Sequence, residues 1–526
     1  MCGCDLRACG LVCGNVRTNL GVRVSVCAHG EDGVGGSCGS DRVLLAQRQP
    51  GYRAHRVGSD ADVALLRAAA RQRLVAGQGV LDLGLELSAA AEGGGPLPIT
   101  GSRMGHLVEA IRGGYAALGL PEAAGRDEVF AQLVLARIIE PTSKLDSIRV
   151  LQEAGVSPPA YRTVARRLPR YAKPEWRQAV SAACARHAGL GPASLVLYDV
   201  STLYFETDTG DGFRESGFSK ERRLEPQITI GLLTDESGFP LAIEAFEGNK
   251  AETATMLPVI RAFMKAHRLH DVTVVADAGM VSAANQQAIE AEGLSFILGA
   301  RVPDEPYVLA QWRRDNPGRQ LPDGLVLTQP WPAGPTDARR DQVIYYQYRH
   351  DRARRTLKGI DEQVGKAERA VEGKAPVKRN RFIKLTGASK SVNRQLEAKA
   401  RSIAGIKGYV TNLTDVDAQF VIGAYHRLFE IEKSFRMSKS DLRARPIFHH
   451  KRESIEAHLA VVFAALAVSR WIEHETGWSI RRFTKTARRY RTIEINAGGH
   501  TVTAADPLPD DLATALNDIK TAAARH

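Results

Sequence analysis

Hydrophobic and polar positions change their spacing several times along the chain, and each change predicts a new element. Short apolar runs rich in β-branched residues predict strands at 194–205, 227–233, 240–246, 272–276 and 295–299. Apolar residues repeated every three or four positions predict helices at 252–267 and 283–291. The middle of the chain therefore has the order β-β-β-α-β-α-β.

This order indicates an α/β fold with a ribonuclease-H-like core. Three consecutive strands form a meander in that arrangement, and the alternating half supplies parallel crossovers. The alternation stops at residue 301 and resumes only after residue 405. It then continues with a strand at 407–410, a helix at 419–437 and an apolar helix at 452–473. We therefore expect a long insertion to interrupt the core.

Two short helices before the sheet have the layout of a helix-turn-helix. They are predicted at 143–154 and 161–168, and a Gly-Val-Ser-Pro-Pro turn separates them. The second helix is basic, with Arg162, Arg166 and Arg167, as in a helix that contacts DNA. Two packed helices with an arginine-rich surface would give the same pattern, so both interpretations stay open.

These patterns divide the chain into six regions. In chain order we expect a poorly ordered or misassigned leader (1–55), a helical N-terminal, DNA-binding region (56–190), the first part of the core (191–300), a basic insertion (301–405), the second part of the core with the helix at 419–437 (406–475), and a C-terminal region (476–526).

Composition favours a soluble protein with a polyanionic partner. Of the 526 residues 44% are hydrophobic, yet the longest apolar run, Leu459 to Val468, is half of the roughly 20 residues that span a membrane. The net charge is +12, and residues 349–401 hold 16 Lys and Arg against 6 Asp and Glu. This excess includes Lys378, Arg379 and Arg381 and indicates either a surface that faces nucleic acid or a solvated helical surface.

Cysteines separate the first residues from the rest of the chain. Six of the seven lie within residues 1–38, at spacings that match no familiar zinc-ligand pattern. The remaining residues hold only Cys184, which suits a reducing cytoplasm.

Two aspartates at the ends of predicted buried strands are the first candidates for chemistry. Asp199 follows a Leu-Val-Leu-Tyr run and Asp277 follows Val-Val-Ala. A carboxylate at such a place is costly to desolvate unless it meets a cation or hydrogen-bond donors. Either aspartate alone could cap the next turn. Because the first and fourth strands are neighbours in this topology, the pair favours a shared metal site.

A third carboxylate is expected from the helix at 419–437. Tyr425, Glu432 and Lys439 are spaced seven and seven, which places them along one helix face. Glu430 falls on the opposite side. A solvated face of a charged helix would show the same spacing. Three carboxylates would suit a hard divalent cation such as Mg²⁺ or Mn²⁺.

Seven short motifs that include these residues follow one another along the chain. They are Tyr198-Asp199-Val200-Ser201-Thr202-Leu203-Tyr204-Phe205-Glu206, Gly217-Phe218-Ser219-Lys220-Glu221, Glu247-Gly248-Asn249-Lys250, Asp277-Ala278-Gly279, Tyr425-x6-Glu432-x6-Lys439, Phe435-Arg436-Met437-Ser438-Lys439 and Arg445-Pro446-Ile447-Phe448-His449. From roughly Val57 to the C-terminus the sequence thereby resembles the DDE transposases of the IS4 group, and within it the IS1634 family.

The resemblance implies a function and assigns roles to residues. It implies an insertion-sequence transposase in a bacterial cytoplasm, at the nucleoid, which binds terminal inverted repeats of double-stranded DNA, cleaves the element ends and transfers the 3′-OH ends to target DNA. It implies that Asp199, Asp277 and Glu432 form the catalytic triad and bind two Mg²⁺ (or Mn²⁺) ions. It also implies that Tyr425 and Lys439 contact the cleaved end.

Joining two ends to one target requires two active sites, so we expect a homodimer on DNA. The alternatives are a stand-alone metal-dependent nuclease and a catalytically inactive DNA-binding relative.

Overall fold

The chain divides into two compact units, which are described separately. The computed structural model describes residues 12–17, 23–28, 44–46 and 97–525, except 192, 208, 218–224, 252–253, 270, 279–282, 335–338, 377–379, 387–388, 446, 448 and 498–499. The first unit is Met1–Gly101 with Ile493–Ala504, and the second is Ser102–Thr492 with Ala505–His526. The predicted core lies wholly in the second unit.

The first unit contributes strands to two small sheets. One sheet contains β1 (Val12–Arg17), β2 (Arg23–Ala28) and β3 (Leu44–Ala46), which pair antiparallel. The other has the order β16-β15-β4, with β4 at Ile99–Arg103, β15 at Thr492–Ala497 and β16 at His500–Ala505. Apart from the first three strands, the expected leader at 1–55 lies outside the described residues.

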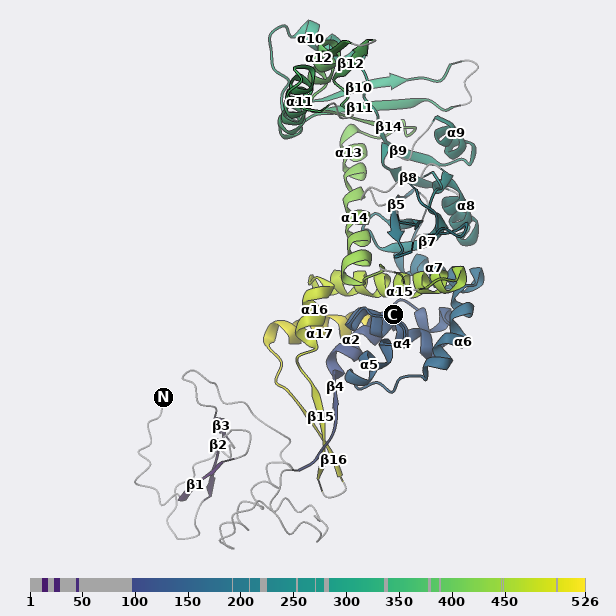
Figure 1. Cartoon of the computed structure of the whole chain (residues 1–526). Helices are drawn as coiled ribbons and strands as arrows, with labels where there is room; N and C mark the ends of the chain where they lie inside the picture. Colours follow the sequence, from purple (N-terminus) through teal and green to yellow (C-terminus); the bar gives the residue numbers. More distant parts are fainter. Residues whose placement is uncertain are drawn as a thin grey trace. The chain divides into compact units, whose positions relative to one another are not determined.

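One large mixed sheet organises the second unit (Figure 1). Its eight strands have the order β10-β11-β14-β9-β8-β5-β6-β7. The first three in the chain, β5 (Ser194–Tyr204), β6 (Gln227–Asp235) and β7 (Pro240–Glu247), form an antiparallel meander. The next two, β8 (Val272–Ala276) and β9 (Ser295–Ala300), run parallel to β5. The strand order and directions confirm the prediction of an α/β sheet that fits a ribonuclease-H-like core.

Helices cover both faces of this sheet. The crossover helices α8 (Met256–His267) and α9 (Ala283–Ala291) lie on one side, and α13 (Ala418–His426) and α14 (Leu428–Arg436) lie in line on the other (Figure 1). Near-continuous apolar runs such as Val272–Ala276 are buried along their whole length because both faces are covered.

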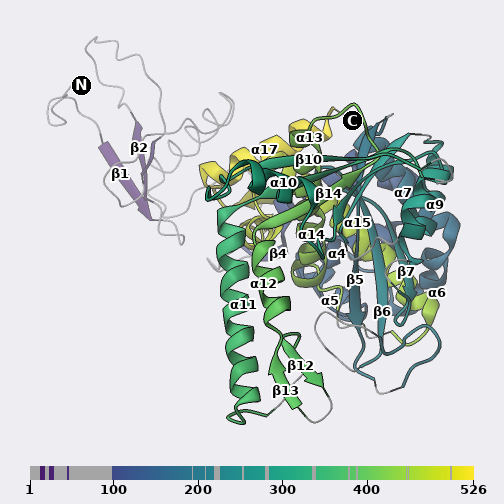
Figure 2. The same cartoon turned by 90° about the horizontal axis from the view of Figure 1, so that it is seen from above.

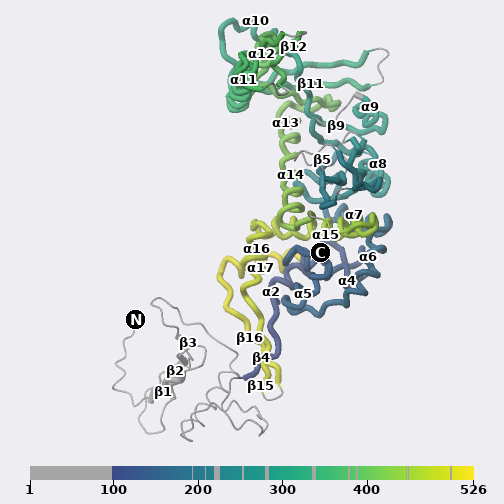
Figure 3. The backbone as a smooth tube through the Cα atoms, in the orientation of Figure 1, coloured from purple at the N-terminus to yellow at the C-terminus, as the bar shows by residue number. Residues whose placement is uncertain are grey.

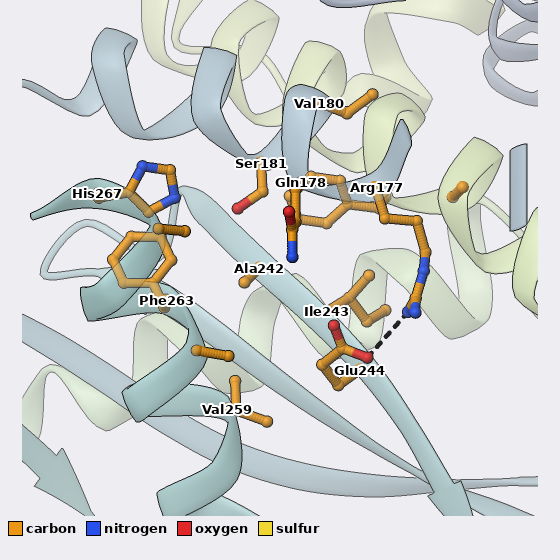
Figure 4. Close-up of a pocket in the computed structure, with 14 residues that line it drawn as sticks. Arg177, Gln178, Val180, Ser181, Ala242, Ile243, Glu244, Val259, Phe263 and His267 are labelled. Carbon is orange, nitrogen blue, oxygen red and sulfur yellow. Dashed lines mark hydrogen bonds and ion pairs between the residues drawn. The ribbon is translucent and has the colours of Figure 1, made fainter. Parts of the chain in front are cut away.

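Helix α7 (Pro174–Ala188) joins the meander to the helical region before it. As Figure 4 shows, the Arg177 guanidinium forms an ion pair with Glu244 of β7, at 2.9 Å. The Ser181 hydroxyl donates a hydrogen bond to the Leu241 carbonyl at 2.6 Å. The cavity between these elements and α8 has a volume of about 60 Å³ and contains none of the candidate site residues. This contact is therefore structural.

The segment 301–405 is only partly an insertion beside the sheet. Its strands β10 (Val326–Trp331) and β11 (Gln342–Tyr348) extend the sheet, because β11 pairs with β14 (Ile406–Thr411) and β14 pairs with β9. The predicted strand at 407–410 lies within β14. The return of 407–410 to the core sheet agrees with the prediction, whereas the extension of that sheet by β10 and β11 was not predicted.

The rest of this segment has a small core of its own. Its elements are α10 (Tyr307–Asp315), α11 (His350–Val371), β12 (Ile383–Thr386), β13 (Ser389–Val392) and α12 (Arg394–Ser402). Helices α11 and α12 lie side by side, with the β12–β13 hairpin next to them (Figure 2). Ile360, Val364 and Phe382 are buried among these elements.

The helical region before the sheet packs on one long apolar helix. It comprises α2 (Gly105–Ala117), α3 (Leu120–Ala123), α4 (Glu128–Ile139), α5 (Ser147–Glu153) and α6 (Tyr161–Ala172), and the C-terminal helices are α15 (Arg452–Thr476), α16 (Ile480–Ala487) and α17 (Asp510–Ala523). Figure 3 shows α15 between this region and the sheet. By length and composition α15 could cross a membrane, but 89% of its most apolar window is buried, so it forms part of the core here.

Only part of the arginine surface on α6 is available to a partner. Arg167 forms an ion pair at 2.7 Å with Asp127, whose side chain is buried and caps the first turn of α4. Arg162 and Arg166 remain exposed. Arg167 therefore has a structural role, whereas the DNA contact expected of this region rests on the other two arginines.

Candidate active site

Asp199 lies on the face of the sheet that α14 covers. The hydroxyl of the preceding residue, Tyr198, forms a hydrogen bond at 3.0 Å with the Thr255 hydroxyl, directly before α8. Successive side chains of a strand point to opposite faces. Asp199, which is half-buried, therefore points away from α8, and α14 contacts its strand on that side.

Asp277 stands beside Asp199 at the end of the neighbouring strand. The parallel register of β5 and β8 pairs Leu197 with Val275, so two further positions along each strand bring Asp199 level with Asp277. Neighbouring strands are about 4.8 Å apart. Asp277 is exposed, and its Oδ1 accepts a hydrogen bond from the Ala278 amide at 2.8 Å. It thus also stabilises the turn, as the alternative interpretation expected.

The Tyr425 side chain reaches this edge from α13. Its hydroxyl donates a hydrogen bond to Asp277 Oδ1. A Cβ atom at Gly299 of β9 would lie 2.8 Å from the Tyr425 oxygen, so the glycine allows this approach. Burial, and then the hydrogen bond to Asp277, raise the pKa of Tyr425 far above its ordinary value. The hydroxyl therefore stays protonated at neutral pH and acts as a donor.

Lys407 is a residue of this site that the sequence analysis missed. It belongs to β14, and its Nζ lies 4.2 Å from the centroid of the Tyr425 ring. Burial lowers the pKa of Lys407, while the charges of Asp277 and Glu432 act in the opposite direction. The available signal was a single charged residue in the otherwise uncharged strand Ile406–Thr411.

Glu432 lies on α14 and belongs to the same electrostatic environment. Its charge and that of Asp277 both act on Lys407 and on Tyr425. The Glu432 side chain is exposed, while its neighbour Ile431 is buried. Glu430 points elsewhere, as its spacing predicted, and forms ion pairs with Lys433 at 2.8 Å and Arg470 at 3.3 Å.

The prediction of a single helix at 419–437 is wrong. Helix α13 ends at His426 and α14 begins at Leu428, and the intervening Arg427 forms an ion pair with Glu236. After α14 the chain makes a π-helical turn, η3 (Met437–Asp441), which contains the half-buried Lys439. A π-turn contains more residues than an α-turn, so Lys439 does not follow the predicted α-helical spacing.

The chemistry of the three carboxylates fits a divalent cation, but their arrangement is not a preformed metal site. Among the residues that the structure describes, no three His, Cys, Asp or Glu side chains are grouped closely enough to hold a metal ion. Asp277 Oδ1 already accepts two hydrogen bonds. Carboxylate oxygens are nevertheless the donors that Mg²⁺ and Mn²⁺ prefer.

The basic residues predicted to contact DNA are described only in part. Lys378 and Arg379 lie outside the described residues. Arg381 is exposed, and its guanidinium lies 4.5 Å from the centroid of the buried Phe382 ring. The guanidinium therefore makes a cation–π contact with Phe382 while the side chain remains accessible to solvent.

Comparisons with known proteins identify the family of the chain. The family described as Transposase DDE domain matches residues 191–468, which include all three carboxylates and Tyr425, Lys407 and Lys439. No protein of curated function matches the chain. Among the solved structures that are similar is the piggyBac transposase synaptic complex with hairpin DNA. It is 11% identical with a TM-score of 0.39, and the match covers 73% of this chain and 76% of that chain.

Proposed function

Because the chain belongs to the Transposase DDE domain family, we propose that it is the transposase of an insertion sequence. The observation that carries this proposal is the family match over residues 191–468, in which Asp199 lies within β5, Asp277 directly follows the neighbouring strand β8, and Glu432 lies on the facing helix. The motifs that resemble the IS4 group and the IS1634 family support membership in both. The substrate is double-stranded DNA that carries the terminal inverted repeats of the element.

Each residue of the site has a distinct role in this proposal. Asp199, Asp277 and Glu432 would hold two Mg²⁺ or Mn²⁺ ions. When bound, such ions lower the pKa of an attacking water and stabilise the charge on a leaving oxygen. The Tyr425 hydroxyl and the Ala278 amide fix one oxygen of Asp277. Water and then the freed 3′-OH are the nucleophiles, and the Tyr425 hydroxyl serves as a hydrogen-bond donor to Asp277.

Two cations serve the phosphate groups of the DNA end. Lys407 is half-buried beside Tyr425, and a cation in such a low-dielectric place interacts strongly with a phosphodiester. Lys439 follows α14 by three residues and contacts the cleaved strand further along. Both are point charges without a fixed planar geometry, which suits contact with several phosphate positions.

The proposal is tested by incubating the full chain with DNA that carries the ends of its own element and Mg²⁺. We expect cleavage at the ends that leaves 3′-OH groups, followed by joined products with a target plasmid. Cleavage that needs no particular ends and gives no joined product would identify a stand-alone nuclease. Specific binding without cleavage would identify a catalytically inactive relative.

The basic segment makes a prediction about salt dependence. Replacing Lys378, Arg379 and Arg381 together by glutamine should weaken DNA binding and reduce the log–log slope of affinity against salt by about two to three, since each phosphate contact contributes roughly 0.9. Affinities measured by fluorescence anisotropy at several salt concentrations give the slope. The control replaces three exposed residues outside the segment, Lys265, Lys520 and Arg525. An unchanged slope would show that these three residues belong to a solvated surface that does not contact DNA phosphates.

Assembly on two DNA ends makes a second prediction. The working form is at least a dimer, in which one subunit grips the end that the other cleaves. A Glu432→Gln chain mixed with the triple variant of Lys378, Arg379 and Arg381 should then recover some of the cleavage that each has lost. Gel shift and light scattering report the two-end complex. Cleavage at full rate by an isolated monomer would refute the assembly.

A further inference from the structure

A second site with unusual chemistry lies away from the carboxylates. A pocket of about 380 Å³ lies between α4, the segment 141–145 that follows it, and the start of α6. Its lining is completed by Arg443, Arg445 and His449 and by His458 of α15. Basic side chains dominate its lining, namely Arg137, Lys144, Arg443, Arg445, His449 and His458. None of the described residues that line it is acidic. Two others, Tyr161 and Leu145, are 47% and 61% exposed, so the pocket is open to solvent.

Two of these cations are almost completely buried. Arg137 and Lys144 are each 6% exposed. Lys144 Nζ lies 3.1 Å from His458 Nδ1, and His458 Nε2 lies 3.1 Å from the Ala444 carbonyl oxygen. The network is satisfied if the ammonium donates to Nδ1 and a neutral imidazole donates from Nε2, an assignment made from the partners. Two ammonium protons of Lys144 are then left to face the pocket.

Three basic side chains of this pocket have no acidic partner among the described residues. None of the ion pairs within the described part of the chain includes Arg137, Lys144 or Arg443. Burial lowers the pKa of Arg137 to about 10, and burial and then the charge of Arg137 lower the pKa of Lys144 well below its ordinary value. Burial, and then the charges of Lys144 and Arg137, lower the pKa of His449 to about 4. Buried cations are costly unless an anion pairs with them, so the pocket is arranged for an anion that comes from outside.

The pocket lies within reach of a DNA molecule bound at the carboxylates. The Arg445 guanidinium lies 5.1 Å from the centroid of the Tyr204 ring, and Tyr204 is the last residue of β5. Asp199 is five residues earlier on the same strand, a distance of about 16 Å at roughly 3.3 Å per residue. B-DNA rises about 3.4 Å per base pair, so this distance corresponds to about five base pairs.

We propose that this pocket binds a phosphate group, and that in the working complex it is a backbone phosphate of the DNA held at Asp199, Asp277 and Glu432. The claim that this phosphate belongs to bound DNA rests on the proposed function. The claim that the pocket binds a phosphate group does not. Buried lysine and arginine donors, with further cations at the opening, are the groups that bind phosphate oxygens through charge-assisted hydrogen bonds. The phosphate also supplies a counter-charge for Arg137, Lys144 and Arg443, which form no ion pair within the described residues.

The first arm of the test uses inorganic phosphate and the full chain. Arg137→Met and Lys144→Met should each weaken phosphate binding, measured by titration calorimetry, by about tenfold or more, because each removes a charged donor. Without phosphate, Arg137→Met should melt at the same temperature as the wild type or higher, because it removes a buried charge that has no ion-pair partner among the described residues. The control Lys520→Met changes an exposed lysine and should match the wild type.

A purely structural role gives the opposite result. If Lys144 only holds His458, Lys144→Met should lower the melting temperature equally with and without phosphate, and phosphate affinity should not change. That outcome would overturn the proposal. Arg137→Met is the second, independent variant, because Arg137 does not contact His458 through a hydrogen bond in the described structure.

The second arm uses duplex DNA with the element ends. We expect both variants to bind it about tenfold more weakly, with a salt slope lower by about one. Lost phosphate binding with unchanged DNA affinity would overturn the DNA half and identify a free phosphate compound as the ligand. If the wild type cleaves no DNA but the variants lose phosphate binding, the pocket stands while the proposed function fails.

Discussion

Replacing Asp199 or Asp277 by asparagine, or Glu432 by glutamine, is expected to abolish DNA cleavage while leaving binding to the ends largely intact. Each change keeps the shape of the side chain and removes the negative charge that a divalent cation needs. A loss of at least a thousandfold corresponds to about 4 kcal/mol on the barrier. Single-turnover cleavage in Mg²⁺ measures the loss, and gel shift measures binding.

Glu430→Gln is the matched control on the same helix. Its carboxylate forms ion pairs with Lys433 and Arg470 and points away from the site. We expect a small decrease in melting temperature and cleavage close to that of the wild type. Full activity in any of the three test variants would remove that residue from the triad. A thousandfold loss of cleavage rate in Glu430→Gln would show that cleavage depends on the total negative charge of this helix and not on Glu432 in particular.

The second large effect is expected from Gly231→Ala in the central strand β6. Intrinsic β-propensity alone would favour the alanine by several tenths of a kcal/mol. The added Cβ atom would lie 2.2 Å from the Tyr198 oxygen and 2.9 Å from Cζ. Tyr198 is fully buried and its hydroxyl is hydrogen-bonded to Thr255, so the ring has nowhere to move. We expect a loss of about 3 kcal/mol in the free energy of unfolding, measured by urea denaturation.

Two further variants identify the cause of that loss. Tyr198→Phe removes the closest atom, so the double variant should recover part of the stability, with a favourable coupling energy. Gly359→Ala places its Cβ in open space on α11 and should stabilise by about 0.5–1 kcal/mol. If Gly231→Ala unfolds like the wild type, or if its effect adds to that of Tyr198→Phe without coupling, the close contact does not explain it.

Local sequence patterns were sufficient to predict the five core strands and to place Asp199 and Asp277 on neighbouring strands. Each of these strands contains a short apolar run, and Asp277 directly follows β8 as predicted, whereas β5 continues five residues beyond Asp199 to Tyr204. Their pairing follows from general rules for parallel crossovers, which do not depend on distant contacts. The period of the α-helix, which is also a local property, places Glu430 away from Glu432 on their common helix.

Features that depend on distant contacts were not predictable. The break at Arg427 follows no helix-breaking residue and coincides with an ion pair to Glu236, nearly 200 positions earlier. Lys407 is part of the site only because β14 pairs with β9. The basic pocket combines Arg137 and Lys144 with His458, which lies more than 300 positions later, so no local pattern indicates it.

The position of β14 has a consequence for synthesis of the protein on the ribosome. Strand β9 emerges with residues 295–300, but its partner β14 follows only after residues 301–405. At roughly 5–20 residues per second, one side of β9 stays unpaired for about 5–20 s. That strand contains Phe296, Ile297 and Leu298, and an open apolar edge can pair with other nascent chains. Slower elongation lengthens this interval, so the yield of soluble protein should depend on how quickly the intervening segment is translated.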